Sequence, residues 1–213
     1  MTTPSDAPTP GAAALEQADA LAQAGSSIAA VARYRDLLAS DPGHVEARLR
    51  LAQLLVRLEE RDEAVALLTQ GLGRTPDSLE FTFLRGTILS RLRRYDEAEA
   101  DLRRVLRARP ADASAEFELG LVAWRRGLGT QAIEHFRRAQ SHRPDDARTS
   151  YHLADALNQA GDLPAARDAL EQALRSNPRD AKVHHLLGRV LDRMGRLEDA
   201  RDMYQRAREL GGA

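Results

Sequence analysis

The chain of 213 residues contains no cysteine, which excludes disulfide bridges, thiolate metal sites and lipidated cysteines. Aromatic residues make up only 4 % of the composition, and Lys182 is the single lysine. No apolar run approaches the roughly 20 residues of a membrane-spanning helix. Residues 1–10 lack the basic start and apolar core of a secretory signal. We therefore expect no membrane insertion and a cytoplasmic location.

A charge excess of either sign is also missing. The formal net charge is −1 at pH 7, which gives no general electrostatic case for a nucleic-acid partner. The basic residues are arginine almost without exception, and alanine is abundant. This composition favours a bacterium with a GC-rich genome as the source.

Sequence motifs of catalytic, metal-binding and phosphate-binding sites are absent as well. No His-Glu-x-x-His motif and no glycine-rich phosphate loop occurs, and the histidines do not pair at helical spacing (His44, His135, His142, His152, His184 and His185). Serines and carboxylates are scattered in the manner of solvated helix faces. We expect no catalytic residues, no metal site and no cofactor, because catalysis needs a convergent set of groups.

What the chain does contain is a helix–turn–helix pattern, clearest in residues 113–146. Two short amphipathic helices are expected at residues 113–126 and 130–142, with a glycine-containing turn between them. Leu119-Gly120 lies in the first helix, Ala132 and Phe136 lie in the second, and Pro144 closes the unit. One such unit cannot bury its own apolar face, so further copies are expected.

The same residue types recur with a period of 34 residues. Prolines end the second helices at Pro42, Pro76, Pro110, Pro144 and Pro178. An alanine ladder comprises Ala30, Ala64, Ala98, Ala132, Ala166 and Ala200. A ladder of large residues comprises Tyr34, Leu68, Leu102, Phe136, Leu170 and Tyr204, and a ladder of small ones comprises Ala18, Ala52, Gly86, Gly120, Ala154 and Gly188. Small residues let two helices approach closely, and large ones fill the space beside them.

These ladders resemble the tetratricopeptide repeat, or TPR, over about residues 11–213. The aromatic residue usual near the start of the first helix is replaced by Arg48 and Glu116, and Gln17 and Arg85 replace an expected leucine. The resemblance implies an all-α, right-handed superhelical solenoid of antiparallel helix pairs that binds other proteins. Its six units would be residues 11–44, 45–78, 79–112, 113–146, 147–180 and 181–213. The proline-rich, polar residues 1–10 would be a disordered leader.

The resemblance also implies a concave groove lined by the first helices. Counting from the first residue of each unit, the fifth positions carry Leu15, Leu49, Phe83, Phe117, Tyr151 and His185. Trp124 falls at a twelfth position, and four thirteenth positions carry arginine (Arg57, Arg91, Arg125 and Arg193). The expected partner-binding residues are therefore Leu49, Phe83, Phe117, Trp124, Tyr151, His185, Arg57, Arg91, Arg125 and Arg193.

Exposed aromatic residues bordered by arginine favour a protein or peptide partner with apolar anchors and acidic side chains. The chain is thus interpreted as a non-enzymatic protein–protein interaction scaffold that binds its partner in the groove. Two alternatives remain open. The chain could be a self-assembling scaffold that homo-oligomerises through its ends or its leader, or an accessory module of a separate enzyme.

Overall fold

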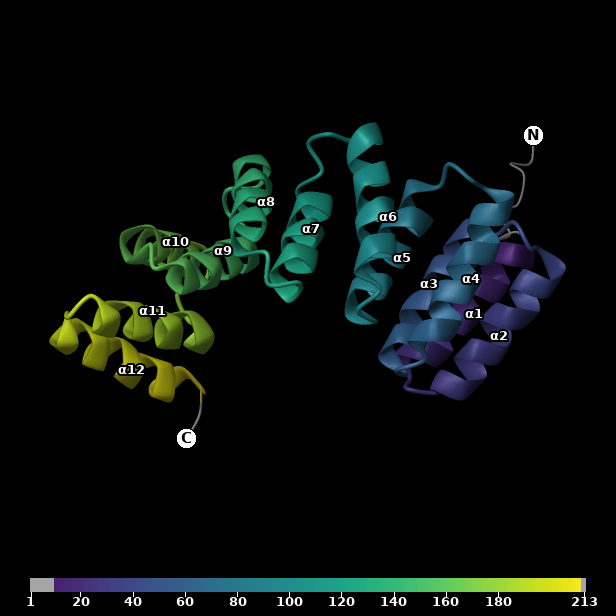
Figure 1. Ribbon diagram of the computed structural model, residues 1–213. Helices are drawn as coiled ribbons and strands as arrows, with labels where there is room; N and C mark the ends of the chain where they lie inside the picture. The colour runs from purple at the N-terminus through teal and green to yellow at the C-terminus, as the bar shows by residue number, and fades with distance from the viewer. Residues whose placement is uncertain (1–9, 212–213) are drawn as a thin grey trace, which may run out of the picture. The chain divides into compact units, whose positions relative to one another are not determined.

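The computed structural model describes residues 10–211, and within that range every element is an α-helix (Figure 1). The first six helices are α1 (Pro10–Gln23), α2 (Ser27–Ser40), α3 (Val45–Arg57), α4 (Arg61–Arg74), α5 (Leu79–Arg91) and α6 (Tyr95–Ala108). The others are α7 (Ala113–Arg125), α8 (Gly129–His142), α9 (Ala147–Ala160), α10 (Leu163–Ser176), α11 (Ala181–Arg193) and α12 (Leu197–Gly211). The predicted all-α architecture is confirmed. The predicted leader lies outside the described residues, apart from Pro10, which begins α1.

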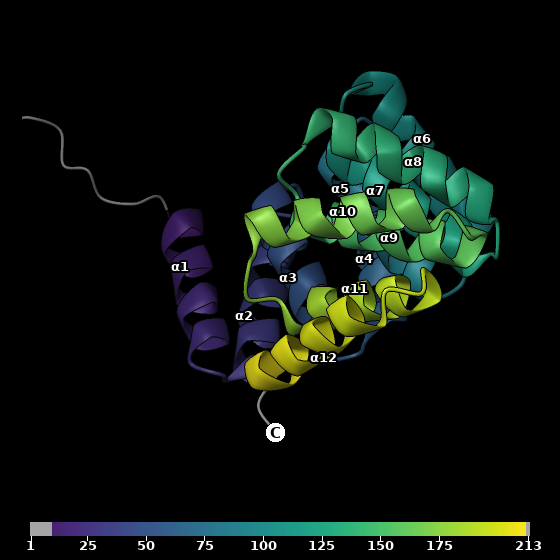
Figure 2. The same ribbon diagram turned by 90° about the vertical axis from the view of Figure 1, so that its left-hand side faces the viewer.

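Helices adjacent in sequence pack as pairs, and the pairs stack on one another. Contacts join α1 to α2, α3 to α4, α7 to α8, α9 to α10 and α11 to α12. The second helix of a pair also contacts the first helix of the next, as α2 does with α3, α8 with α9 and α10 with α11. Figure 2 shows α11 and α12 running side by side. This nearest-neighbour packing is the pattern expected of a repeat array.

The chain forms two compact units, residues 1–104 and 105–213. Helices α1–α5 lie in the first unit and α7–α12 in the second, and the boundary falls inside α6. The single continuous array from residue 11 to residue 213 stays a prediction, and the packing below is described within each unit.

The ladders found in the sequence form the core. All six members of the alanine ladder are at most 2 % exposed, as predicted for residues at helix–helix contacts. The large ladder is buried from Tyr34 to Leu170, whereas Tyr204 in the last pair is half-buried. Gly120 shows why the first helix needs a small residue, because a Cβ atom there would lie 2.5 Å from the ring of Phe136. The two helices of this pair are therefore fixed by a glycine–phenylalanine contact.

The turn inside each pair requires one residue in the left-handed region. Glycine fills it in four pairs, with φ near +80° at Gly25, Gly127, Gly161 and Gly195. In the second and third pairs the same place is taken by Glu59 (φ 67°) and Arg93 (φ 61°). A side chain in this region costs roughly 1–2 kcal/mol relative to its ordinary conformation. The turn geometry is thus set by the packing of the two helices, and it is kept even without glycine.

Candidate functional site

A surface cavity of about 720 Å³ opens among α1, α2 and α3 in the first unit. Two predicted groove residues, Leu49 and Arg57, line it together with Tyr34 and Asp19. Leu49 is half-buried and Arg57 is exposed. Both come from one side of α3, as their spacing along the helix dictates. The cavity therefore combines apolar side chains with charged side chains of both signs, and we call it the N-terminal cavity.

Asp19 ties together the three helices around the N-terminal cavity. Its carboxylate accepts a hydrogen bond from the Tyr34 hydroxyl of α2 at 2.5 Å, and it forms an ion pair with Arg50 of α3. Arg50 also pairs with Glu46 at 2.7 Å. Burial raises the pKa of Tyr34, with Arg57 opposing it, so the hydroxyl remains a donor. Sequence reasoning gave Asp19 no role, because its partners come from two other helices.

Phe83 and Arg91 lie on α5 of the same unit. Phe83 is half-buried and Arg91 is exposed. The backbone carbonyl of Phe83 accepts a hydrogen bond from the Thr87 hydroxyl at 3.1 Å. Both side chains are therefore accessible at least in part, as the groove prediction requires.

Phe117 departs from the groove prediction, since its side chain is only 4 % exposed. The guanidinium carbon of Arg148, from α9, lies 4.1 Å from the centre of the Phe117 ring. Arg148 also donates to the Glu118 carboxylate at 3.2 Å. The rings of Phe136 and His152 pack beside Phe117 at centroid distances of 5.6 and 5.4 Å. The expectation that Phe117 presents its ring to a ligand is wrong, because the following repeat covers it.

His152 is held neutral in this aromatic cluster. Burial lowers its pKa to about 4, and the positive charges of Arg148 and Arg125 act in the same direction. Its ring stacks on Phe136 at a centroid distance of 5.9 Å and meets Tyr151 edge-on at 5.4 Å. His152 therefore acts as an aromatic spacer between two repeats, not as an acid or a base near neutral pH.

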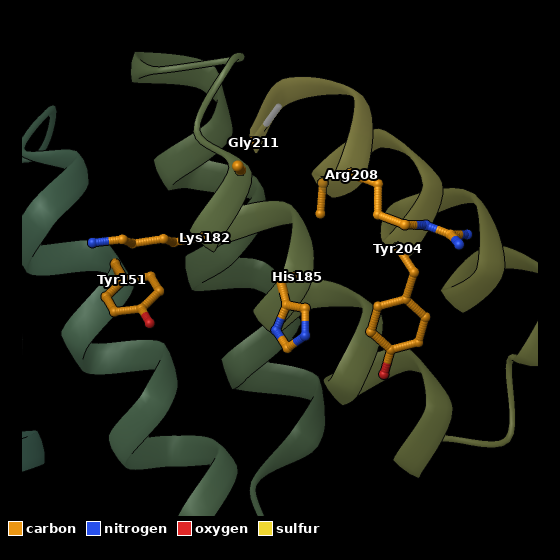
Figure 3. A pocket seen from close by; sticks show the side chains of 8 residues that line it. Tyr151, Lys182, His185, Tyr204, Arg208 and Gly211 are labelled. Atoms are coloured by element: carbon orange, nitrogen blue, oxygen red, sulfur yellow. The ribbon is translucent and has the colours of Figure 1, made fainter. Parts of the chain in front are cut away.

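A second cavity, of about 640 Å³, lies in the second unit and contains two more predicted residues, Tyr151 and His185. The other lining residues are Ala181, Lys182, Tyr204, Ala207, Arg208 and Gly211. We call it the C-terminal pocket. Figure 3 shows His185 and Tyr204 next to each other, with Tyr151 and Lys182 on one side. The His185 and Tyr204 rings are 5.6 Å apart at 60°. Burial raises the pKa of both tyrosines, so they remain neutral donors.

The remaining predicted residues divide into packed and exposed ones. Trp124 is half-buried against the apolar core of the second unit. Arg193 donates to the backbone oxygen and side-chain oxygen of the buried Asn158, which ties α11 to α9. Arg125 is exposed, and its charge acts on His152. Arg193 therefore has a structural partner that sequence reasoning missed.

Buried polar groups replace the aromatic residue usual near the start of the first helix. Arg48 is 5 % exposed and donates to the backbone oxygens of Leu67 and Pro42 at 3.2 and 2.7 Å. Glu116 is also buried and lies 2.7 Å from the ring nitrogen of His135. These departures from the repeat pattern were visible in the sequence. They indicate structural cross-links between helices, because their polar atoms are directed at neighbouring chain segments and not at solvent.

A third cavity, of about 640 Å³, lies between the second helices α2 and α4. Arg35, Leu38, Leu67 and Arg74 are among its lining residues. Arg35 is bonded to Glu63 at 2.5 Å across this surface. The cavity belongs to the second-helix side of the first unit and contains none of the predicted groove residues.

Within residues 10–211, no cluster of three or more histidine or acidic side chains could hold a metal ion. Among the described helices, none is both long enough and apolar enough to cross a membrane.

Comparison with solved structures shows the same architecture in other proteins. PilW, described as a widely conserved type IV pilus biogenesis factor, is similar with a TM-score of 0.82 and 23 % identity, covering 92 % of this chain and 91 % of that chain. PilF of Pseudomonas aeruginosa is similar with a TM-score of 0.80 and 20 % identity over 95 % and 93 % of the two chains. YrrB, described as a TPR protein with an unusual peptide-binding site, has a TM-score of 0.64 and 18 % identity over 83 % and 91 %.

Family models give the assignment. A search of curated protein sequences finds no match. Models of the tetratricopeptide repeat match residues 21–85, 83–147, 123–189 and 157–211, which together cover most of the chain. The helix pairs, the buried alanine ladder and these matches agree. The chain therefore belongs to the tetratricopeptide repeat family.

Proposed function

We propose that this protein is a non-enzymatic interaction scaffold that binds a peptide segment of a partner protein along its first helices. The observation that carries the proposal is the N-terminal cavity, in which Leu49 and Arg57 meet at the positions where the repeat pattern expects ligand contacts. The likeness to YrrB, whose description names a peptide-binding site, supports a ligand of the same kind.

The chemistry of the N-terminal cavity favours a particular peptide. Leu49, Ala22 and the Tyr34 ring provide an apolar floor for one anchor side chain. Arg57 has no ion-pair partner among residues 10–211, so its guanidinium is available for a carboxylate. Arg50, in contrast, is already paired with Asp19 and Glu46. An apolar anchor followed by an acidic residue is therefore the proposed core of the recognised segment, with Phe83 and Arg91 as a second contact on α5.

The test is a selection of peptide ligands against the full chain, followed by titration of a labelled binder. Leu49→Ala with Arg57→Ala should weaken the selected peptide at least tenfold, or about 1.4 kcal/mol, since an anchor and a charge partner are both lost. The matched control is Arg35→Ala with Leu38→Ala, which removes the same residue types from the second-helix cavity. Circular dichroism checks folding in each variant.

Each outcome assigns the binding surface. A loss confined to the Leu49/Arg57 variant supports the proposal. A loss confined to the Arg35/Leu38 variant would move binding to the second-helix side and refute it. Full affinity in both variants would also refute it. The accessory role for a separate enzyme uses the same surface, and it is distinguished by whether the protein that contains the selected sequence is an enzyme.

A further inference from the structure

Among the described residues, the first and the last helix each lack a neighbouring repeat on one side. Inside each unit, the second helix of a repeat packs against the first helix of the next, as between α8 and α9 or α10 and α11. Within the described residues, α12 has no first helix after it, and α1 has no repeat before it. The C-terminal pocket is formed on α12 and on the adjacent side of α11, and α9 contributes Tyr151 to it.

The residues of the C-terminal pocket are equivalent to a packing site that is occupied elsewhere in the same unit. His152, the sixth residue of its repeat, packs against Phe117 and Phe136 of the preceding repeat. Those two phenylalanines are the fifth and twenty-fourth residues of their repeat, and their rings are 5.6 Å apart. The equivalent residues of the last repeat are His185 and Tyr204, whose rings are also 5.6 Å apart. The pocket therefore has the shape of a seat for the sixth residue of one more first helix.

A second internal contact indicates which residue would occupy that seat. Arg50, the sixth residue of its repeat, forms an ion pair with Asp19, the ninth residue of the preceding repeat. The ninth residue of the last repeat is Arg189, which is exposed and close enough to Tyr204 to act on its hydroxyl. The sixth residue of the first repeat is Glu16 on α1, which is exposed. The pair Glu16–Arg189 would thus repeat the Arg50–Asp19 contact with the charges reversed.

We propose that α1 of a second copy of this chain docks in the C-terminal pocket, with Glu16 beside Arg189 and over the His185–Tyr204 pair. Such a contact joins two different surfaces, so the copies associate head to tail and the assembly can extend. The site is separate from the N-terminal cavity, and the inference does not rest on the proposed function.

The chemistry of the two surfaces is complementary. The C-terminal pocket presents Lys182 and Arg208 and contains no acidic side chain. The first turns of α1 are alanine-rich around Glu16 (Gly11, Ala12, Ala13 and Ala14). Small residues there leave room for the bulky Tyr204 and Arg208, and the single carboxylate meets a basic surface. Among residues 10–211, Glu16, Lys182 and Arg189 form no ion pair, and the charge of Arg189 acts on the Asp155 carboxyl without direct contact.

The first experiment measures the mass of the full chain by sedimentation over a range of concentrations up to the millimolar range. The wild-type mass should rise with concentration. Glu16→Arg or Arg189→Glu should each weaken association at least tenfold, because like charges then face each other. The double variant Glu16→Arg with Arg189→Glu should recover association, since the pair is restored with its signs exchanged. Asp36→Arg, at an exposed position of α2, is the control, and it should behave as wild type.

The second experiment tests the register directly and uses the natural absence of cysteine. Single variants Glu16→Cys and His185→Cys are mixed and treated with a short thiol cross-linker. They should give one mixed dimer, much faster than Asp36→Cys mixed with His185→Cys. A wild-type chain that stays monomeric throughout overturns the proposal, and so does cross-linking no faster than in the control mixture. Association that survives both single charge reversals places the contact elsewhere and also overturns it. The Leu49→Ala/Arg57→Ala variant should associate normally, which keeps this result distinct from the peptide-binding test.

Discussion

Replacing Gly120 with alanine should destabilise the α7–α8 pair, although the same replacement usually favours a helix. Alanine stabilises a helix interior by about 1 kcal/mol relative to glycine. At this position the added Cβ would lie 2.5 Å from two ring atoms of Phe136, which is fully buried. Overpacking of this kind costs roughly 1–3 kcal/mol. The net expectation is a loss of about 1 kcal/mol.

The repeat itself indicates how the clash is relieved. At the positions equivalent to Gly120 and Phe136, two other repeats carry the combinations Ala52 with Leu68 and Ala154 with Leu170, all fully buried. Phe136→Leu should therefore compensate Gly120→Ala, and the double variant should be more stable than the sum of the single effects by about 1 kcal/mol or more. The first repeat carries Tyr34 at the position of Phe136 and alanine, Ala18, at the position of Gly120. There the Tyr34 hydroxyl is hydrogen-bonded to Asp19 of α1.

Urea unfolding monitored by circular dichroism gives the free energies, with hydrogen exchange in α7 and α8 to localise the change. Localisation matters because a repeat array need not unfold in a single step. The control is Gly73→Ala in α4, where nothing lies within 4 Å of the added Cβ, so stability should be kept or raised. The reasoning is refuted if Gly120→Ala is as stable as wild type, or if the effects of Gly120→Ala and Phe136→Leu simply add.

Two further predictions concern the turns and the aromatic cluster. Arg93→Gly should raise the free energy of unfolding by about 0.5–1 kcal/mol. The variant removes a side chain from the left-handed region, and this gain is larger than the cost of the greater unfolded-state entropy of glycine. Urea unfolding checks this, and Gly127→Ala should lower the free energy of unfolding. The pKa of His152 is about 4 in the folded state, below its ordinary value of 6.5, so the unfolded state binds more protons between these values. Stability should therefore fall as the pH drops from about 6.5 to 4, by up to about 1.4 kcal/mol per pH unit, and His152→Phe should flatten this part of the profile.

The helix pairs were predictable because the same information occurs six times in the sequence. A proline or an alanine at one position says little, but recurrence every 34 residues fixes the phase of every helix. The observed α2, α6 and α9 begin and end at the predicted residues (27–40, 95–108 and 147–160). Burial of the alanine ladder follows from the same phase. The glycine-free turn of the second pair was also expected, since Glu59-Glu60-Arg61 stands where other units carry glycine, whereas the left-handed Arg93 of the third pair was not.

The contacts between side chains of different repeats were not predictable in this way. Arg148 packs over the Phe117 ring because the second position of the next repeat carries a long, positively charged side chain. The bond from Arg193 to Asn158 depends on an amide at another position of the preceding repeat. Neither position is periodic in residue type, so the repeat phase places the backbone but not the partner. The position of each ladder residue along the repeat was predictable, whereas its accessibility was not.

Accessibility along the fifth-position ladder follows from what the next repeat places over it. Phe117 is buried because Arg148 and His152 of the following first helix cover its ring. Tyr151 is half-buried, and Figure 3 shows the Lys182 side chain alongside it. His185 is exposed, and no described helix follows its repeat to cover it. The fifth-position ladder is thus most deeply buried at Phe117, where side chains of the next repeat cover the ring, and most exposed at His185 in the last described repeat. The most open member of the ladder is therefore the one in the last repeat, where another first helix would find its seat already formed.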